Sequence, residues 1–183
     1  MLPQNYLDET IKGLRKLKDL ADKAVAQISD GDFFATLDPE SNSIAAIVKH
    51  MAGNMRSRWT DFLTSDGEKP DRNRDSEFVI EVRDAKESLL KRWEIGWRCL
   101  FEALTPLTTE DLDKTVMIRG EPHSVIRAIH RQLTHYAYHV GQIVFLAKHF
   151  AGTRWQSLSI PRGKSGELNP AMQTKGQESS TLQ

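Results

Sequence analysis

The stretch Leu133-Thr-His-Tyr-Ala-Tyr-His-Val-Gly-Gln-Ile-Val144 decides the fold of this chain. Its apolar residues return at spacings of three and four, which is the period of one face of an α-helix. The pattern begins near Ser124, a suitable N-cap, and ends near Gly152, a normal helix stop. A long amphipathic helix is therefore predicted over about residues 124–150.

Working outward, three further segments repeat the helical period, and they lie at about residues 5–28, 44–63 and 84–104. A polar loop at 64–77 separates two of them and is near the long end of normal loop lengths. A short β-prone run ends at Gly120 and Pro122, which predicts a small extended segment or hairpin arm before the last long helix. The sequence thus predicts an all-α chain with four long helices.

The composition bounds the function. A chain of 183 residues suits one domain. Its 25 basic and 25 acidic residues cancel, so no overall field favours nucleic acid or an anionic membrane. The single cysteine, Cys99, excludes an intrachain disulfide and a cysteine-based zinc finger. No stretch approaches the roughly 20 apolar residues of a membrane span, and no signal-peptide pattern opens the chain. We expect a cytoplasmic protein without a nucleic-acid or membrane partner.

Two histidines, His135 and His139, stand four residues apart in the last predicted helix. Residues at this spacing share one helix face, about 6 Å apart in rise, so both imidazoles can reach one metal ion. They lie beside the apolar stripe, as does His50 on the second helix, where an ordinary bundle would have a solvated face. Side chains lining a cleft between helices would be placed in this way. Spacing alone leaves two interpretations open, a metal site and ordinary surface or core-edge histidines.

The residue types narrow the chemistry of such a site. Three neutral imidazoles on a divalent metal leave coordination positions for water or substrate, as in catalytic sites. Metalloproteases of the zincin type place Glu directly after the first histidine, where this chain has Tyr136. Di-iron carboxylate bundles need Glu-x-x-His pairs, and the sequence contains none. Both of these classes are therefore excluded.

The histidine pattern is similar to that of the DinB/YfiT-like superfamily of metal-dependent enzymes, which combines four helices, a lone histidine on the second helix and His-x-x-x-His followed by Gly-Gln on the last. Four further motifs resemble a bacterial branch of that superfamily whose function is uncharacterised. They are Asn42-Ser-Ile-Ala-Ala-Ile-Val-Lys-His50, Gly53-Asn-Met-Arg-Ser-Arg-Trp59, Asp66-Gly-Glu-Lys-Pro70 and Ser159-Ile-Pro-Arg-Gly-Lys-Ser165. The resemblance covers about residues 5–169.

This resemblance implies a single four-helix-bundle domain of up-down-down-up type over residues 1–169 and a homodimer. The composition of residues 170–183 predicts a polar, flexible tail. The resemblance also implies one divalent metal held by His50, His135 and His139, and imidazole ligands suit Zn, Ni, Fe and Mn. Relatives in the superfamily include thiol-dependent S-transferases and a mycothiol-dependent maleylpyruvate isomerase. We therefore expect a metal-dependent transferase that activates a low-molecular-weight thiol against a small-molecule substrate. A non-catalytic metal-binding homodimeric bundle and a metal-dependent hydrolase remain alternatives.

Other polar residues are candidates for supporting roles. Gln142 follows His139 by about one turn and is suited to orient an imidazole. Asn54 and Arg58 follow His50 on the second helix and are candidates for contact with a metal ligand or the substrate. Arginines in this region and in the polar loop either bind substrate or cofactor carboxylates or form ion pairs that fix the loop, and we favour ion pairs. These arginines are Arg56, Arg58, Arg72 and Arg74. The four tryptophans are expected in the core or a dimer interface.

Overall fold

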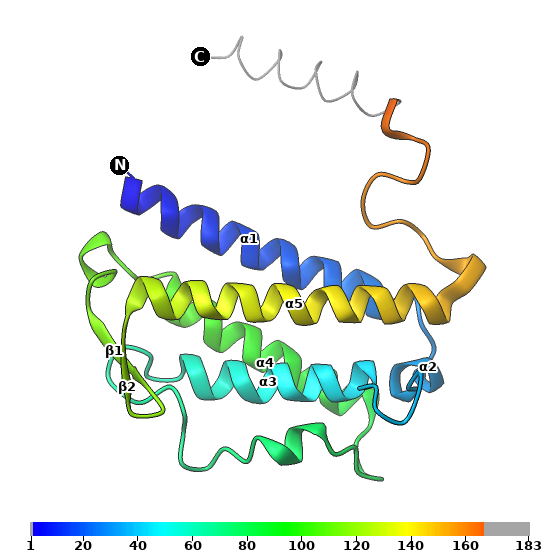
Figure 1. Cartoon of the computed structure of the whole chain (residues 1–183), viewed down its shortest axis with the longest axis horizontal. Coiled ribbons are helices and arrows are strands. Elements are labelled where there is room, and N and C mark those ends of the chain that lie inside the picture. Colours follow the sequence, from blue (N-terminus) through cyan, green and yellow to red (C-terminus); the bar gives the residue numbers. More distant parts are fainter. Residues whose placement is uncertain (1, 167–183) are drawn as a thin grey trace.

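The computed structural model of the protein describes residues 2–166, so the predicted tail at 170–183 lies outside the described residues. Within that range the chain is mostly helical, as predicted (Figure 1). The α-helices are α1 (Leu2–Val25), α2 (Asp30–Phe34), α3 (Ile44–Trp59), α4 (Lys86–Leu104) and α5 (Val125–Ala151). The short 3-10 helices are η1 (Asp75–Phe78), η2 (Thr109–Asp111) and η3 (Gly152–Arg154), and the strands are β1 (Thr115–Ile118) and β2 (Glu121–Ser124).

The four long helices α1, α3, α4 and α5 pack around one hydrophobic core. Helix α3 lies along α4, and α1 lies along α5 (Figure 1). The α3–α4 approach is close because Gly96 of α4 faces α3, where an added Cβ would lie 3.2 Å from Cα of Ala52. Trp59, Trp93 and Trp97 are buried in the core, as predicted. Burial of such large side chains supplies much of the stability of a domain of this size.

Three predicted helix boundaries are wrong, the first being the start of the first long helix, which lies at Leu2 instead of 5. The first long helix ends at Val25 instead of 28, and a separate short helix, α2, follows it. Ser29 caps α2 through a reciprocal pair of hydrogen bonds with Asp32, which form a capping box. The second helix ends at Trp59 instead of 63, because Thr60 is already extended, with ψ of 126°, and Asp61 then has a positive φ of 50°.

The predicted extended segment is a two-stranded hairpin. β1 pairs antiparallel with β2, and at its tip Arg119 and Gly120 both have positive φ, as a tight hairpin turn requires. The carboxylate of Asp66 accepts hydrogen bonds from both of these backbone amides, at 2.8 and 2.7 Å. The hairpin tip is thereby attached to the polar stretch that follows α3.

That polar stretch, residues 60–78, covers one side of α3, and we call it the covering segment. The hydroxyl of Ser57 donates to the carbonyl of Gly67 at 3.0 Å and accepts from the amide of Lys69 at 2.9 Å. His50 and Asn54 on the same side of α3 are only 3% and 5% exposed. The side chains that an ordinary bundle would leave solvated are therefore buried here.

Among the described residues, no helix has the length and hydropathy of a membrane-spanning segment.

Candidate metal centre

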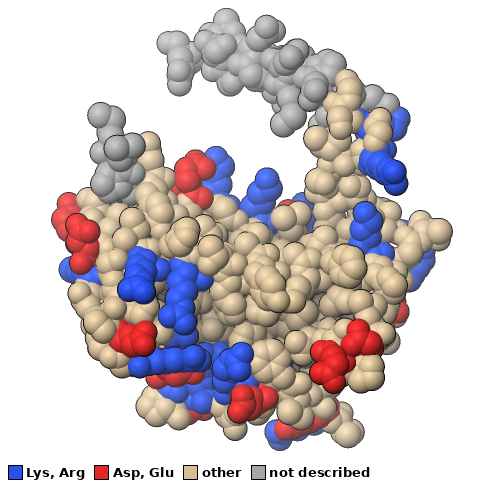
Figure 2. Space-filling model, in the orientation of Figure 1, with Lys and Arg blue, Asp and Glu red and all other residues tan. Residues whose placement is uncertain are grey.

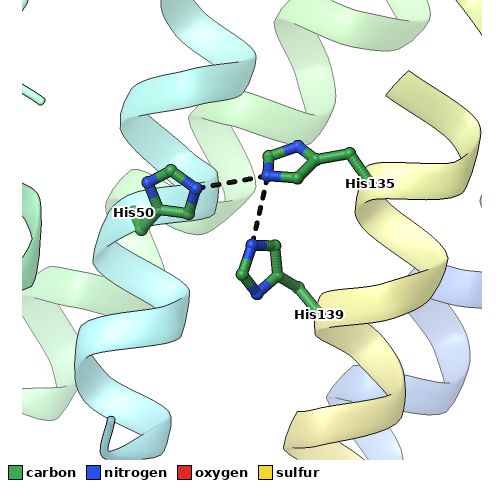
Figure 3. Close-up of side chains that lie close together, drawn as sticks. All are labelled: His50, His135 and His139. Carbon is green, nitrogen blue, oxygen red and sulfur yellow. Dashed lines mark hydrogen bonds between the residues drawn. The ribbon is translucent and has the colours of Figure 1, made fainter. Parts of the chain in front are cut away.

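The three predicted ligands, His50 of α3 and His135 and His139 of α5, come together in the structure (Figure 3). Nε2 of His135 lies 3.3 Å from Nε2 of His50 and 3.1 Å from Nε2 of His139. One nitrogen from each of the three rings lies within 4.8 Å of the other two. His50 and His139 are buried, whereas His135 is partly exposed.

The outer nitrogens of two rings have acceptors that fix the tautomer. Nδ1 of His50 lies 2.8 Å from Oε2 of Glu77, and an ionised carboxylate only accepts hydrogen bonds. Nδ1 of His139 lies 2.8 Å from Oε1 of Gln142, which also accepts. Both Nδ1 atoms therefore carry a proton, and in the neutral form of each ring Nε2 carries the lone pair. These two lone pairs point toward the same place, where Nε2 of His135 also lies.

A single metal ion satisfies this arrangement better than hydrogen bonds do. One proton on Nε2 of His135 can serve only one of the two lone pairs that approach it. Two imidazole nitrogens bound about 2.1 Å from one ion are about 3.4 Å apart in tetrahedral geometry and about 3.0 Å apart at a right angle. The two separations from His135, 3.1 and 3.3 Å, lie within that range, and the ligand nitrogens of His50 and His139 lie within 4.8 Å of each other. The residues present thus fit a three-imidazole metal site.

The protonation of the ligands agrees with metal binding. Burial, together with the charges of the neighbouring histidines and arginines, lowers the pKa of His135 to about 3. Burial also lowers the pKa of His139, although its hydrogen bond with Gln142 acts in the opposite direction. Both imidazoles are therefore neutral near pH 7. Only the neutral ring offers the nitrogen lone pair that a metal ion needs.

Glu77 supports His50 and is itself held by Arg72. Nε and Nη2 of Arg72 donate to the two carboxylate oxygens of Glu77 at 2.8 and 2.9 Å. Burial raises the pKa of Glu77, but the hydrogen bonds from His50 and Arg72 lower it more, so the net shift is downward and the group is ionised. A carboxylate that accepts from the outer nitrogen of a metal-binding histidine orients the ring and increases its basicity.

Gly53 makes this contact possible. It lies on α3 less than one turn after His50, and an added Cβ would be 2.3 Å from Oε1 of Glu77. No real Cβ tolerates that distance, so any larger residue would displace the carboxylate. Phe78 adds a second contact by stacking on the His50 ring, with centroids 4.6 Å apart and an interplanar angle of 25°.

The arginines mainly form the predicted ion-pair network. Arg72 also donates a hydrogen bond to Glu68 at 3.2 Å. Glu68 forms further ion pairs with Arg58 at 3.4 Å and with Arg119 at 3.1 Å. Arg56, at the surface, pairs with Asp71 at 2.7 Å. This network fixes the covering segment against α3 and the hairpin.

Of the three supporting candidates, Gln142 contacts an imidazole directly. Asn54 accepts a hydrogen bond from the Tyr136 hydroxyl at 3.0 Å, and that hydroxyl accepts from Nε1 of Trp59 at 2.9 Å. Arg58 is buried against Glu68, and its Nε and Nη1 atoms have no hydrogen-bond partner among the described residues. Asn54 and Arg58 therefore contribute to the surroundings of the site through other side chains.

A comparison with protein families finds a match that covers almost all of the described residues. Residues 2–164 match the family described as "Protein of unknown function (DUF1572)". The chain belongs to this family. No curated protein was found to match the DUF1572 chain.

Sequence reasoning missed Glu77 and Phe78, and it named Arg72 as an ion-pair candidate without linking it to a histidine. The covering segment carries several carboxylates, and sequence alone does not show which of them folds back onto α3. A glycine inside a helix was the available signal, because such a residue often marks a close approach by another part of the chain. In the DUF1572 chain that residue is Gly53.

Proposed function

We propose that His50, His135 and His139 bind one divalent transition-metal ion, Zn, Ni, Fe or Mn, and that the protein is a metal-dependent transferase using a low-molecular-weight thiol. The observation that supports metal binding most directly is the convergence of two bare Nε2 lone pairs on a third imidazole nitrogen. We also infer membership of the DinB/YfiT-like superfamily, with its up-down-down-up four-helix bundle. The helical composition and the histidine positions support this assignment.

The proposed site is open for catalysis. Three protein ligands leave at least one coordination position free, and His135 is partly exposed at the edge of the site. A metal ion held there would lower the pKa of a bound thiol, so that the thiolate form is available near neutral pH. Glu77 and Gln142 would orient the histidine ligands. The incoming group would bind from the solvent side, at the free coordination position.

The surroundings favour a thiol over water as the nucleophile. A hydrolase would need a side chain that removes a proton from water, and the two groups closest to that role are already engaged. Arg72 and His50 occupy the carboxylate of Glu77. Burial raises the pKa of Tyr136, and its hydroxyl is bonded to Asn54 and Trp59. A thiol with a lowered pKa needs no such base.

Positive charge near the site favours an anionic small-molecule substrate or thiol cofactor. Lys and Arg side chains gather over the N-terminal part of α5 on the face shown in Figure 2. Arg58 and Arg72 lie near enough to contribute to the lowered pKa of His135. Negatively charged molecules would therefore be attracted to this part of the surface.

A non-catalytic role is the second candidate. In that case the ion would mainly tie α3 to α5, and the burial of His50 and His139 at 3% and 9% exposure favours this role. We also infer a homodimer. Tyr138 and Phe145 support it, because these aromatic side chains of α5 are each 64% exposed.

Metal analysis of the purified protein tests the site. We expect one equivalent of a transition metal per chain, and loss of that metal in a His50→Ala, His135→Ala, His139→Ala variant whose helical content is checked by circular dichroism. Exchange of the surface histidine His149 for Ala is the matched control and should leave the metal in place. Full metal content in the triple variant would overturn the site assignment.

Thiol-dependent conjugation then tests the chemistry. Bacillithiol, mycothiol and glutathione are compared, each with a set of electrophiles, using the metal-loaded protein and the triple variant. Turnover that requires both the metal and a thiol would support the transferase. Stoichiometric metal without turnover for any thiol would favour the non-catalytic bundle.

A further inference from the structure

A second candidate binding site lies on the other side of the Arg72–Glu77 pair from the histidines. It is a cavity of about 500 Å³ between α3, α4 and the covering segment, a size typical of small-molecule pockets. Its walls include Ala52 of α3, Arg92 and Ile95 of α4, and Lys69, Arg72 and Glu77 of the covering segment. None of the three clustered histidines is among them, so this cavity is separate from the proposed metal centre.

The lining is basic although the whole chain has no net charge. Five lining side chains are basic and three are acidic. Ion pairs engage most of these charges, because Glu77 pairs with Arg72, Asp71 with Arg56 at 2.7 Å, and Lys49 with Asp84 at 2.8 Å. Lys69 and Arg92 then remain against the single acidic group of Asp61. The surplus positive charge favours an anion in the cavity.

Two of the basic side chains have no direct carboxylate partner among the described residues. Arg92 of α4 makes no hydrogen bond within the described part of the chain, although its charge helps to lower the pKa of Asp84. Lys69 of the covering segment donates only to neutral oxygens, the Ser65 hydroxyl at 2.8 Å and the Asp66 carbonyl at 2.6 Å. These two cations come from different walls of the same cavity.

We propose that this cavity binds a small anionic metabolite whose carboxylate or phosphate group is held by Lys69 and Arg92. A guanidinium offers two parallel donors to such a group, and the ammonium of Lys69 adds a point charge. Ala52 and Ile95 give the cavity an apolar part, which suits a ligand with a short hydrocarbon body.

Titration of the full-length, ¹⁵N-labelled protein with succinate and with inorganic phosphate tests the proposal. We expect saturable amide shifts at lining residues such as Ser57, Asn73 and Ser76 with at least one of the two anions. The anion that binds more tightly shows whether the site prefers a carboxylate or a phosphate. Succinamide, which has the same length as succinate but no charge, should cause no such shifts.

Substitutions of single side chains test where the anion binds. Arg92→Gln changes an exposed helix residue and should weaken anion binding by on the order of tenfold, as expected for loss of a charge-assisted contact. Lys69→Gln should weaken it similarly. Arg98→Gln, also exposed on α4 but outside the cavity, is the matched control and should bind like the wild type.

The triple histidine-to-alanine variant separates this proposal from the proposed function. It should keep its affinity for the anion while losing the metal. The proposal is overturned if neither anion gives saturable shifts at the lining residues, if Arg92→Gln binds as tightly as the wild type, or if succinamide binds as well as succinate.

Discussion

Oε2 of Glu77 lies 2.8 Å from Nδ1 of His50, across 27 residues of sequence, and the same carboxylate accepts two hydrogen bonds from Arg72. The covering segment therefore reaches the proposed metal centre through one side chain. Because Glu77 keeps the proton on Nδ1 of His50, it leaves Nε2 free to bind a metal ion.

Glu77→Gln should reduce metal affinity. The amide has no charge to polarise His50, and loss of such a partner typically costs roughly 10- to 100-fold in affinity. Competition with a chromophoric chelator measures the dissociation constant. Glu81→Gln, which affects a surface pair with Arg83, is the control. An unchanged dissociation constant in Glu77→Gln would show that this carboxylate does not assist the metal.

Gly53→Ala should have the same effect on metal affinity, because the new Cβ would collide with the Glu77 carboxylate. The control is Gly13→Ala in α1, where an added Cβ meets nothing within 4 Å. There, alanine should increase the free energy of unfolding by up to about 1 kcal/mol through its higher helix propensity. Equal metal affinities for Gly53→Ala and the wild type would contradict the close approach of Glu77 to α3.

Tyr136→Phe should lower the free energy of unfolding by about 1–3 kcal/mol. The change leaves the buried Asn54 oxygen and the Trp59 indole N–H without their shared partner. Urea unfolding followed by tryptophan fluorescence measures the loss. Tyr138→Phe, at a side chain that is 64% exposed, should change stability little, and a similar loss in both variants would argue against a special role of the buried hydroxyl.

Asp84→Asn should lower the free energy of unfolding by about 3 kcal/mol at pH 7, since it leaves Lys49 buried without its carboxylate at 2.8 Å. Burial raises the pKa of Asp84, but bonds from the Glu81 amide and Lys49 lower it more, to a net value below 3.8. The stabilisation is therefore fully present well above the ordinary carboxyl pKa and is lost as the pH falls through the lower, folded-state pKa.

Urea unfolding at several pH values checks this result. The difference between the wild type and Asp84→Asn should shrink as the pH is lowered from 5 toward 2. Asp75→Asn, at a side chain that is 98% exposed, is the control and should show no such difference. A constant difference at all pH values would mean that the charge of Asp84 does not stabilise the fold.

Much of the helical fold could be predicted from local pattern. The period of apolar residues identified the long helices, and the i, i+4 spacing brought His135 and His139 to one face. The end of α3 was missed because Phe62 continues the apolar period of the helix, and the period does not report the left-handed backbone at Asp61. Boundaries of this kind depend on single residues and are the least predictable part of a helix.

The candidate site was predictable only in part. His50 was predicted as the third metal ligand from a family resemblance, because the apolar pattern of its own helix suggested a solvated face. Its burial depends on the path of the covering segment, which is fixed by contacts such as that of Asp66 with the hairpin tip. Interactions across such long stretches of sequence leave no periodic signal, so Glu77 could not be selected in advance, and Arg72 could be named only as one of several arginines expected to form ion pairs.

The close packing of Gly53 against Glu77 has a consequence for the evolution of the family. Positions 53 and 77 are not free to change independently, because a side chain at 53 removes the space that the carboxylate occupies. Homologues that carry a larger residue at 53 should also have replaced the acid at 77, and their histidine at position 50 would have to find another acceptor. Paired substitution at positions 53 and 77 is thus the evolutionary signature expected from the hydrogen bond between Glu77 and His50.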